Sequence, residues 1–138
     1  SIKLDTNGSN PQMIRKLISL NLIDYLAMDI KAPLKKEKYQ KANGVKIDLE
    51  KIKESINIIK KSNIDYEFRT TVVPTIHTLE DIKQMANDIA PAKRYFLQNF
   101  RSEKTLDKNF LKIKPFSEYD LQKIVEEIKN LFEECKVR

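Results

Sequence analysis

Segments with two kinds of apolar pattern alternate along the chain, and this alternation restricts the fold more than any other feature. Runs rich in β-branched and aromatic residues predict strands at 2–5, 23–33, 65–74 and 94–100. Between and after them, apolar residues recur at the spacing of an amphipathic helix. A helix that joins two strands must pack back onto them, so the pattern predicts a parallel α/β sheet.

Capping residues mark where each predicted helix begins. Asn10 precedes Pro11, Asp48 precedes the apolar stripe of the next helix, and Thr78 with Asp81 forms a capping-box pattern. A lysine-rich segment with a short helical turn precedes Gly44. Ser117 is the expected cap of a long final helix, whose apolar face comprises Leu121, Ile124, Val125, Ile128, Leu131, Phe132 and Cys135.

Composition excludes several classes of protein. The 138 residues are 41% hydrophobic and 33% charged, with no apolar run long enough to span a bilayer, so no membrane association is expected. The net charge of +6 comes from basic residues scattered over predicted helices and loops, which favours a solvated surface over a nucleic-acid site. The single cysteine, Cys135, can form no internal disulfide or metal cluster, and we expect a reducing, cytoplasmic location.

The first residues have a pattern that is expected inside a fold, rather than at its beginning. The stretch "LDTNG" reads as the carboxyl end of a strand that breaks into a βα turn. Four βα units cannot close an eight-stranded barrel, so the chain is either a small open sheet or part of a partly closed one. We favour the second interpretation.

Polar residues lie where the predicted strands end. In a parallel sheet these ends share one edge, where ligands bind, so the residues should converge although they are distant in sequence. They are Asp5, Thr6, Asn7, Asp29, Lys31, Arg69, Thr70, Thr71, Gln98, Asn99 and Arg101.

Asp29 and Lys31 interrupt an otherwise apolar segment and lie two residues apart, on one face of the strand. A buried charge needs a partner. Two interpretations stay open from the residues alone: a ligand site, or a structural ion-pair network that links Asp5, Asp29, Lys31 and Arg69.

Five motifs occur in an order and at separations that resemble one family. They are "KLDTNG", "LAMDIKAP", Tyr39 with Gly44, "EFRTTVVP" followed by a histidine, and "LQNFR". Together they resemble the radical S-adenosylmethionine (SAM) activating enzymes of glycyl-radical proteins. The likeness covers nearly the whole chain and is greatest to the anaerobic ribonucleoside-triphosphate reductase activating proteins, then to the pyruvate formate-lyase activating enzymes.

The resemblance implies a fold and an activity. Residues 1–138 would be a single incomplete domain, the C-terminal half of a partial (βα)6 TIM-like barrel. In the family, a [4Fe–4S] cluster on a Cys-x3-Cys-x2-Cys loop reduces SAM, and the resulting 5'-deoxyadenosyl radical takes a hydrogen from a glycine of the partner enzyme. The cluster loop and the glycine-rich strand that holds the methionine amino group would precede residue 1, so the chain alone would be inactive.

The resemblance also implies roles for individual residues. The region near the cofactor carboxylate would contain Asp5, Thr6, Asp29 and the backbone of Met28. In that region Asp5 and Asp29 can hold a monovalent cation. Lys31 would meet the carboxylate or ribose of SAM, and Asn7 would shape the turn with Gly8. Arg69 would lie on the cofactor side, although Glu67 or Asp29 could equally be its partner. Arg101 falls at or beside a position where pyruvate formate-lyase activators carry a histidine, which leaves its own cofactor contact open.

The expected partners follow from the same likeness. They are SAM, an electron donor and a glycyl-radical enzyme of the anaerobic ribonucleotide reductase or pyruvate formate-lyase type. An exposed first strand would also favour self-association. The alternative is a stand-alone α/β module that binds an anionic ligand or nucleotide at its strand ends without redox chemistry. His77, the only histidine, is expected to be a surface or capping residue.

Overall fold

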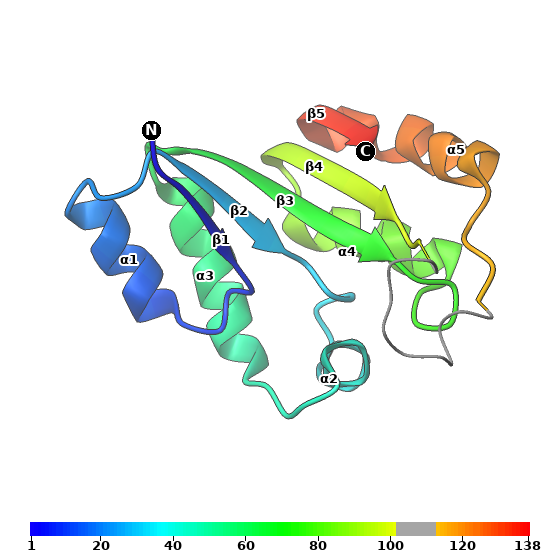
Figure 1. Ribbon diagram of the computed structural model, residues 1–138, viewed down its shortest axis with the longest axis horizontal. Coiled ribbons are helices and arrows are strands. Elements are labelled where there is room, and N and C mark those ends of the chain that lie inside the picture. The colour runs from blue at the N-terminus through cyan, green and yellow to red at the C-terminus, as the bar shows by residue number, and fades with distance from the viewer. Residues whose placement is uncertain (102–112) are drawn as a thin grey trace.

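The described residues form a five-stranded parallel sheet with its strands in chain order. The computed structural model describes residues 1–101 and 113–138. The strands, β1 to β5, are Lys3–Thr6, Tyr25–Asp29, Asp65–Val72, Ala92–Asn99 and Phe132–Val137. The helices, α1 to α5, are Pro11–Ser19, Lys36–Asn43, Leu49–Lys61, Leu79–Ile89 and Glu118–Ile128. The predicted parallel α/β architecture is confirmed (Figure 1).

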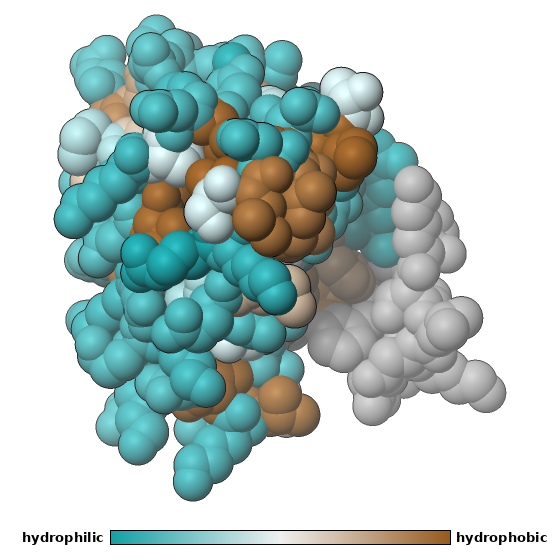
Figure 2. All heavy atoms as spheres, turned by 90° about the vertical axis from the view of Figure 1, so that its left-hand side faces the viewer, coloured by the Kyte–Doolittle hydropathy of each residue, from teal (hydrophilic) through white to brown (hydrophobic). Residues whose placement is uncertain are grey.

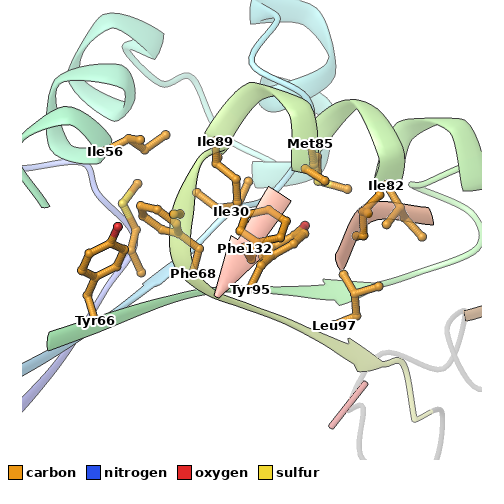
Figure 3. Packing of buried hydrophobic residues seen from close by; sticks show 14 of the residues in the cluster. Ile30, Ile56, Tyr66, Phe68, Ile82, Met85, Ile89, Tyr95, Leu97 and Phe132 are labelled. Carbon is orange, nitrogen blue, oxygen red and sulfur yellow. The ribbon is translucent and has the colours of Figure 1, made fainter. Parts of the chain in front are cut away.

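The strand order determines which face of the sheet the helices cover. Crossovers between parallel strands are right-handed, so strands that follow one another in chain order place their connecting helices on the same face. The buried core contains residues of α1, α3, α4 and α5 packed against alternate strand residues. Figure 3 shows this layer, with Phe68 of β3 and Tyr95 of β4 facing Ile56 of α3 and Met85 of α4.

The predicted helix caps are confirmed. The Asn10 side chain accepts a hydrogen bond from Met13 N, and that of Asp48 accepts one from Glu50 N. Thr78 and Asp81 form both bonds of a capping box, and Ser117 accepts from Asp120 N. The polar residues at these positions satisfy amides that have no partner within the helix.

The prediction of a long final helix is wrong in its second half. Helix α5 ends at Ile128, a short 3-10 turn follows over Lys129–Leu131, and Phe132–Val137 forms β5 beside β4. Phe132 and Cys135 are three residues apart, a spacing that also fits a helix. The unpaired edge of β4 decides the outcome, because β5 pairs with its backbone groups while Phe132 packs on Tyr95, with ring centroids 5.3 Å apart.

Charged side chains occupy the sheet face opposite the core. Glu67 of β3 accepts a hydrogen bond from the Tyr25 hydroxyl at 2.9 Å and pairs with Arg138 at 3.0 Å. Asp65 pairs with Arg94 of β4 at 2.5 Å. The described part of the chain contains no helix with the length and apolarity needed to cross a membrane.

Candidate functional site at the carboxyl edge of the sheet

The turn after β1 is built from its own polar side chains. The Thr6 hydroxyl accepts from Gly8 N at 3.1 Å, and Asn7 Oδ1 accepts from Ser9 N at 2.9 Å. Gly8 has a φ of +78°, in the left-handed region that favours glycine, and its carbonyl accepts from Ser55 Oγ of α3 at 2.7 Å. The predicted turn at Asn7 and Gly8 is therefore confirmed, and it directs β1 toward α1 while Asp5 stays at the sheet edge.

Arg69 joins the carboxylates of two neighbouring strands. Its Nε donates to Asp29 Oδ1 at 2.8 Å, and its Nη2 lies 3.4 Å from Asp5 Oδ2. Burial alone would lower the pKa of Arg69, but the hydrogen bond and charge of Asp29, together with Asp5, raise it. Of the two partners considered from the sequence, Arg69 selects Asp29, because residues 29 and 69 lie side by side in the β2–β3 register.

Lys31 completes the network from the segment after β2. Its Nζ lies 4.0 Å from Asp29 Oδ2, so the predicted link between Asp5, Asp29, Lys31 and Arg69 is confirmed. These four side chains carry two positive and two negative charges at one edge of the sheet.

His77 is expected from the sequence to be a surface or capping residue. It is not at the surface, but its ring accepts a hydrogen bond from Val73 N at the end of β3, as a capping residue would. It is 4% exposed, with Nδ1 2.9 Å from Val73 N and Nε2 2.7 Å from Lys31 O. Burial lowers the pKa of its imidazole, although the Lys31 carbonyl and the charge of Asp81 act in the opposite direction. Sequence reasoning missed this role; the available signal was a single histidine three residues after the "VVP" that closes the predicted strand.

Other predicted residues do not join the ion-pair network. The Met28 side chain lies in the core, on the opposite face from Asp29, so only its backbone can face a ligand at this edge. The Thr6 and Asn7 side chains accept hydrogen bonds within the turn. Arg101 is exposed, and none of the ion pairs between described residues includes it.

A small cavity opens beside the network. It has a volume of about 170 Å³ and is lined by polar residues of the edge, Asp29, Lys31, Thr71 and His77, with apolar Ile30, Ala42, Val73 and Ile76. At the end of β4, Asn99 Nδ2 donates to Phe116 O at 2.8 Å, while its buried Oδ1 has no hydrogen-bond partner among the described residues. A ligand donor could satisfy such an acceptor.

The charges at this edge fit SAM better than a simple anion. SAM has a carboxylate, which suits Lys31 or Arg69, and an ammonium and a sulfonium, which suit Asp5 and Asp29. The described residues do not fit an iron–sulfur cluster: no group of three or more His, Cys, Asp or Glu among them could hold a metal ion. Cys135 lies on β5, where burial raises the pKa of its thiol to about 12.

The parallel sheet has its core helices on one face and charged side chains at the carboxyl ends of its strands. Enzymes of the α/β barrel class carry their active sites at this edge. The sequence pattern of the radical SAM superfamily matches residues 1–89. The chain belongs to this superfamily, whose cofactors are SAM and a [4Fe–4S] cluster.

Two individual proteins are similar over nearly the whole chain. A Methanocaldococcus jannaschii protein named "Putative glycyl-radical enzyme activating enzyme" is 33% identical over 141 residues, which are 99% of this chain and 58% of that protein. The chain thus spans less than two thirds of that relative. The crystal structure of a domain of pyruvate-formate lyase-activating enzyme from Bacteroides vulgatus has the same fold, with a TM-score of 0.67 at 12% identity over 100% of this chain and 99% of that domain.

Proposed function

We propose that this chain is the SAM-binding C-terminal portion of a radical SAM enzyme that activates a glycyl-radical enzyme. SAM bound to a reduced [4Fe–4S] cluster supplies a 5'-deoxyadenosyl radical, which in this proposal takes a hydrogen from a glycine of an anaerobic ribonucleotide reductase or pyruvate formate-lyase type of partner. The observation that carries the proposal is the convergence of Asp5, Asp29, Lys31 and Arg69 at the carboxyl edge of the sheet. The M. jannaschii relative supports the choice of partner class by its name.

The polar face of the sheet supports the assignment to half of a partial barrel. All-parallel sheets normally have both faces covered. Here the face opposite the helices carries charged side chains such as Glu67 and Arg69. A polar inner face suits a curved sheet that lines a ligand cavity, and would be unfavourable against a second layer of apolar helices.

The apolar surface near β1 supports a covering segment at that edge. Figure 2 faces this side of the molecule and shows apolar side chains gathered among polar ones. Among the described residues, the large apolar side chains at least half exposed are Ile2, Met13, Leu20, Leu22, Val45 and Tyr119. The first four belong to β1, α1 or the residues that flank them, and β1 is an edge strand. We infer that the cluster-binding βα units pair with β1 in the full-length protein.

The charged residues at the carboxyl edge of the sheet have different roles in the proposed binding of SAM. Lys31 contacts the carboxylate or a ribose hydroxyl of SAM, and Asp29 holds Arg69 in place through the 2.8 Å hydrogen bond. A monovalent cation between Asp5 and Asp29 would share these carboxylates with the Arg69 guanidinium, which already contacts both. Arg101 is a further contact that the ligand would have to recruit from solvent. The proposal places the enzyme in a reducing, cytoplasmic compartment with an electron donor as a second partner.

The test uses the full-length protein, purified without oxygen and reconstituted with iron and sulfide. The reduced protein is expected to cleave SAM to 5'-deoxyadenosine, and Asp29→Ala is expected to lower the rate by at least a hundredfold. Asp65→Ala is the matched control, since Asp65 also pairs with an arginine on the same face but at the amino end of β3. It should leave the rate within about twofold.

Two results would contradict the proposal. A protein that assembles no cluster and cleaves no SAM would leave the four charges as a structural network or as the site of another ligand. Equal losses in Asp29→Ala and Asp65→Ala would show that the carboxyl edge has no special part in the reaction.

A further inference from the structure

Two buried side chains hold the Lys31 peptide from both sides. The Tyr39 hydroxyl of α2 accepts from Lys31 N at 3.1 Å, and His77 Nε2 lies 2.7 Å from Lys31 O. Tyr39 is 1% exposed and His77 4%. The two come from different segments, one after β2 and the other after β3. The backbone N–H and C=O of Lys31, which lies outside β2, are therefore both bonded to side chains.

The hydrogen-bond partners of His77 determine which of its ring nitrogens carries the hydrogen. A backbone N–H only donates and a carbonyl only accepts, so Nδ1 accepts from Val73 N and Nε2 donates to Lys31 O. Both bonds are made by one neutral tautomer. The ring thus joins the end of β3 to the segment after β2, and neither nitrogen remains for proton transfer to a ligand.

The backbone before Lys31 is held as well. Ile30 N donates to Arg69 O at 2.8 Å, and the Thr70 hydroxyl donates to Ile30 O at 2.8 Å. The chain thus leaves β2 with its path fixed up to Lys31. The Lys31 side chain itself is 39% exposed and lies 4.0 Å from Asp29, which is too loose a contact to orient a long side chain. The position from which the Lys31 side chain extends is therefore set by the hydrogen bonds of its backbone.

We propose that His77 and Tyr39 are positioning residues that set Lys31 for contact with SAM. This inference rests on the proposed function, because it assigns Lys31 to the cofactor carboxylate or ribose. A bound anion gains most from a cation whose backbone is already ordered, since less conformational freedom is lost on binding. Loss of either clamp residue should therefore weaken binding of SAM, although neither side chain touches it.

Two substitutions of His77 separate positioning from simple loop capping. In Gln, the amide nitrogen can occupy the place of Nε2 and keep the bond to Lys31 O. In Asn, the carbonyl oxygen can occupy the place of Nδ1 and keep the bond from Val73 N. A positioning role requires His77→Gln to resemble the wild type more than His77→Asn does, whereas a role in capping the end of β3 requires the reverse order.

The measurement is calorimetric titration of SAM into the unreduced full-length protein with its cluster, so that no turnover occurs. We expect His77→Asn and Tyr39→Phe to raise Kd about tenfold, and His77→Gln to stay within about threefold. Tyr66→Phe is the matched control, because the Tyr66 hydroxyl also accepts from a backbone amide, that of Lys93, at the opposite end of the sheet. It should leave Kd unchanged.

Amide hydrogen exchange of the peptide that contains Lys31 gives a second readout without ligand. Exchange should accelerate in His77→Asn and Tyr39→Phe, and not in His77→Gln. Tyr39→Phe keeps the buried ring and so keeps the test available if His77→Asn does not fold. Faster exchange with unchanged Kd, or a larger loss in His77→Gln than in His77→Asn, would overturn the positioning role. A wild-type protein that binds no SAM would instead overturn the proposed function on which it rests.

Discussion

Met28 Cε lies where a Cβ atom on residue 8 would stand. Gly8 is therefore required twice, once by its φ of +78° and once by the core side chain that packs against it. Gly44 has a similar φ of +76°, but an added Cβ there would meet nothing within 4 Å.

This pair of glycines gives a matched stability test. Gly44→Ala should lower the free energy of unfolding by about 1 kcal/mol, the effect of a left-handed conformation alone. Gly8→Ala should lower it by a further ~1–3 kcal/mol, because Met28 must be displaced from the core. Urea unfolding of the two variants measures both values. Equal losses would mean that Met28 moves aside freely.

The two carboxylates that pair with Arg69 should contribute unequally to the stability of the fold. Asp29 lies at 2.8 Å from the guanidinium and is 36% exposed, whereas Asp5 lies at 3.4 Å and is 60% exposed. After allowance for solvent screening, Asp29→Asn should lower the free energy of unfolding by about 1 kcal/mol. Asp5→Asn should lower it by only about 0.3 kcal/mol. Denaturant titration at low and high salt compares them, and a larger loss in Asp5→Asn would contradict the geometry.

Stability should fall in mildly acidic solution because of His77. Its pKa is lowered in the folded state, so the contribution of the neutral ring is complete above the unfolded pKa of about 6.5. As the pH falls below this value, His77 becomes protonated in the unfolded chain before it does in the folded protein. Its contribution to the free energy of unfolding therefore declines until the pH lies below the pKa of His77 in the folded state. Since the chain has one histidine, the decline between pH 7 and 5 in urea unfolding should shrink in His77→Gln. An unchanged decline would assign it to other groups.

Cys135 should report on the docking of β5. Burial raises the pKa of its thiol to about 12, so little thiolate forms near pH 8 and labelling by a thiol reagent should be slow in the folded protein. Arg138→Ala removes the ion pair with Glu67 and the contact with the Phe96 ring, and should accelerate labelling several-fold. Mass spectrometry of the Cys135 peptide measures the rate. Lys129→Ala, which removes an exposed ion pair in the 3-10 turn, is the control and should not change it.

The isolated 138-residue chain should associate through the β1 edge. β1 is an edge strand, the residue Ile2 directly before it is exposed, and the exposed Leu20 and Leu22 lie in the connection from α1 to the neighbouring strand β2. Light scattering at rising concentration should show dimers or larger species, and Leu20→Glu with Leu22→Glu should reduce them. A monomer at high concentration would contradict this expectation.

Local sequence pattern determined most elements of the fold and predicted which charged residues meet at the carboxyl edge of the sheet. Helical spacing and side-chain caps indicated where the helices begin, because both act over a few residues. Polar residues at strand ends indicated the ligand edge, since parallel strands bring those ends together whatever lies between them. The motif series indicated a radical SAM activating enzyme, and the match over residues 1–89 confirms membership of the radical SAM superfamily.

Only the tertiary structure decided the features that depend on distant partners. The segment 132–137 fits a helix by its own spacing, and it becomes a strand because β4 offers an unpaired edge and Arg138 finds Glu67. His77 is buried where the carbonyl of Lys31, 46 residues earlier, accepts a hydrogen bond from its Nε2. Arg69 selects its partners by the register of β1 to β3. These outcomes follow from contacts between segments, and short-range propensity carries no information about which distant group will lie within reach.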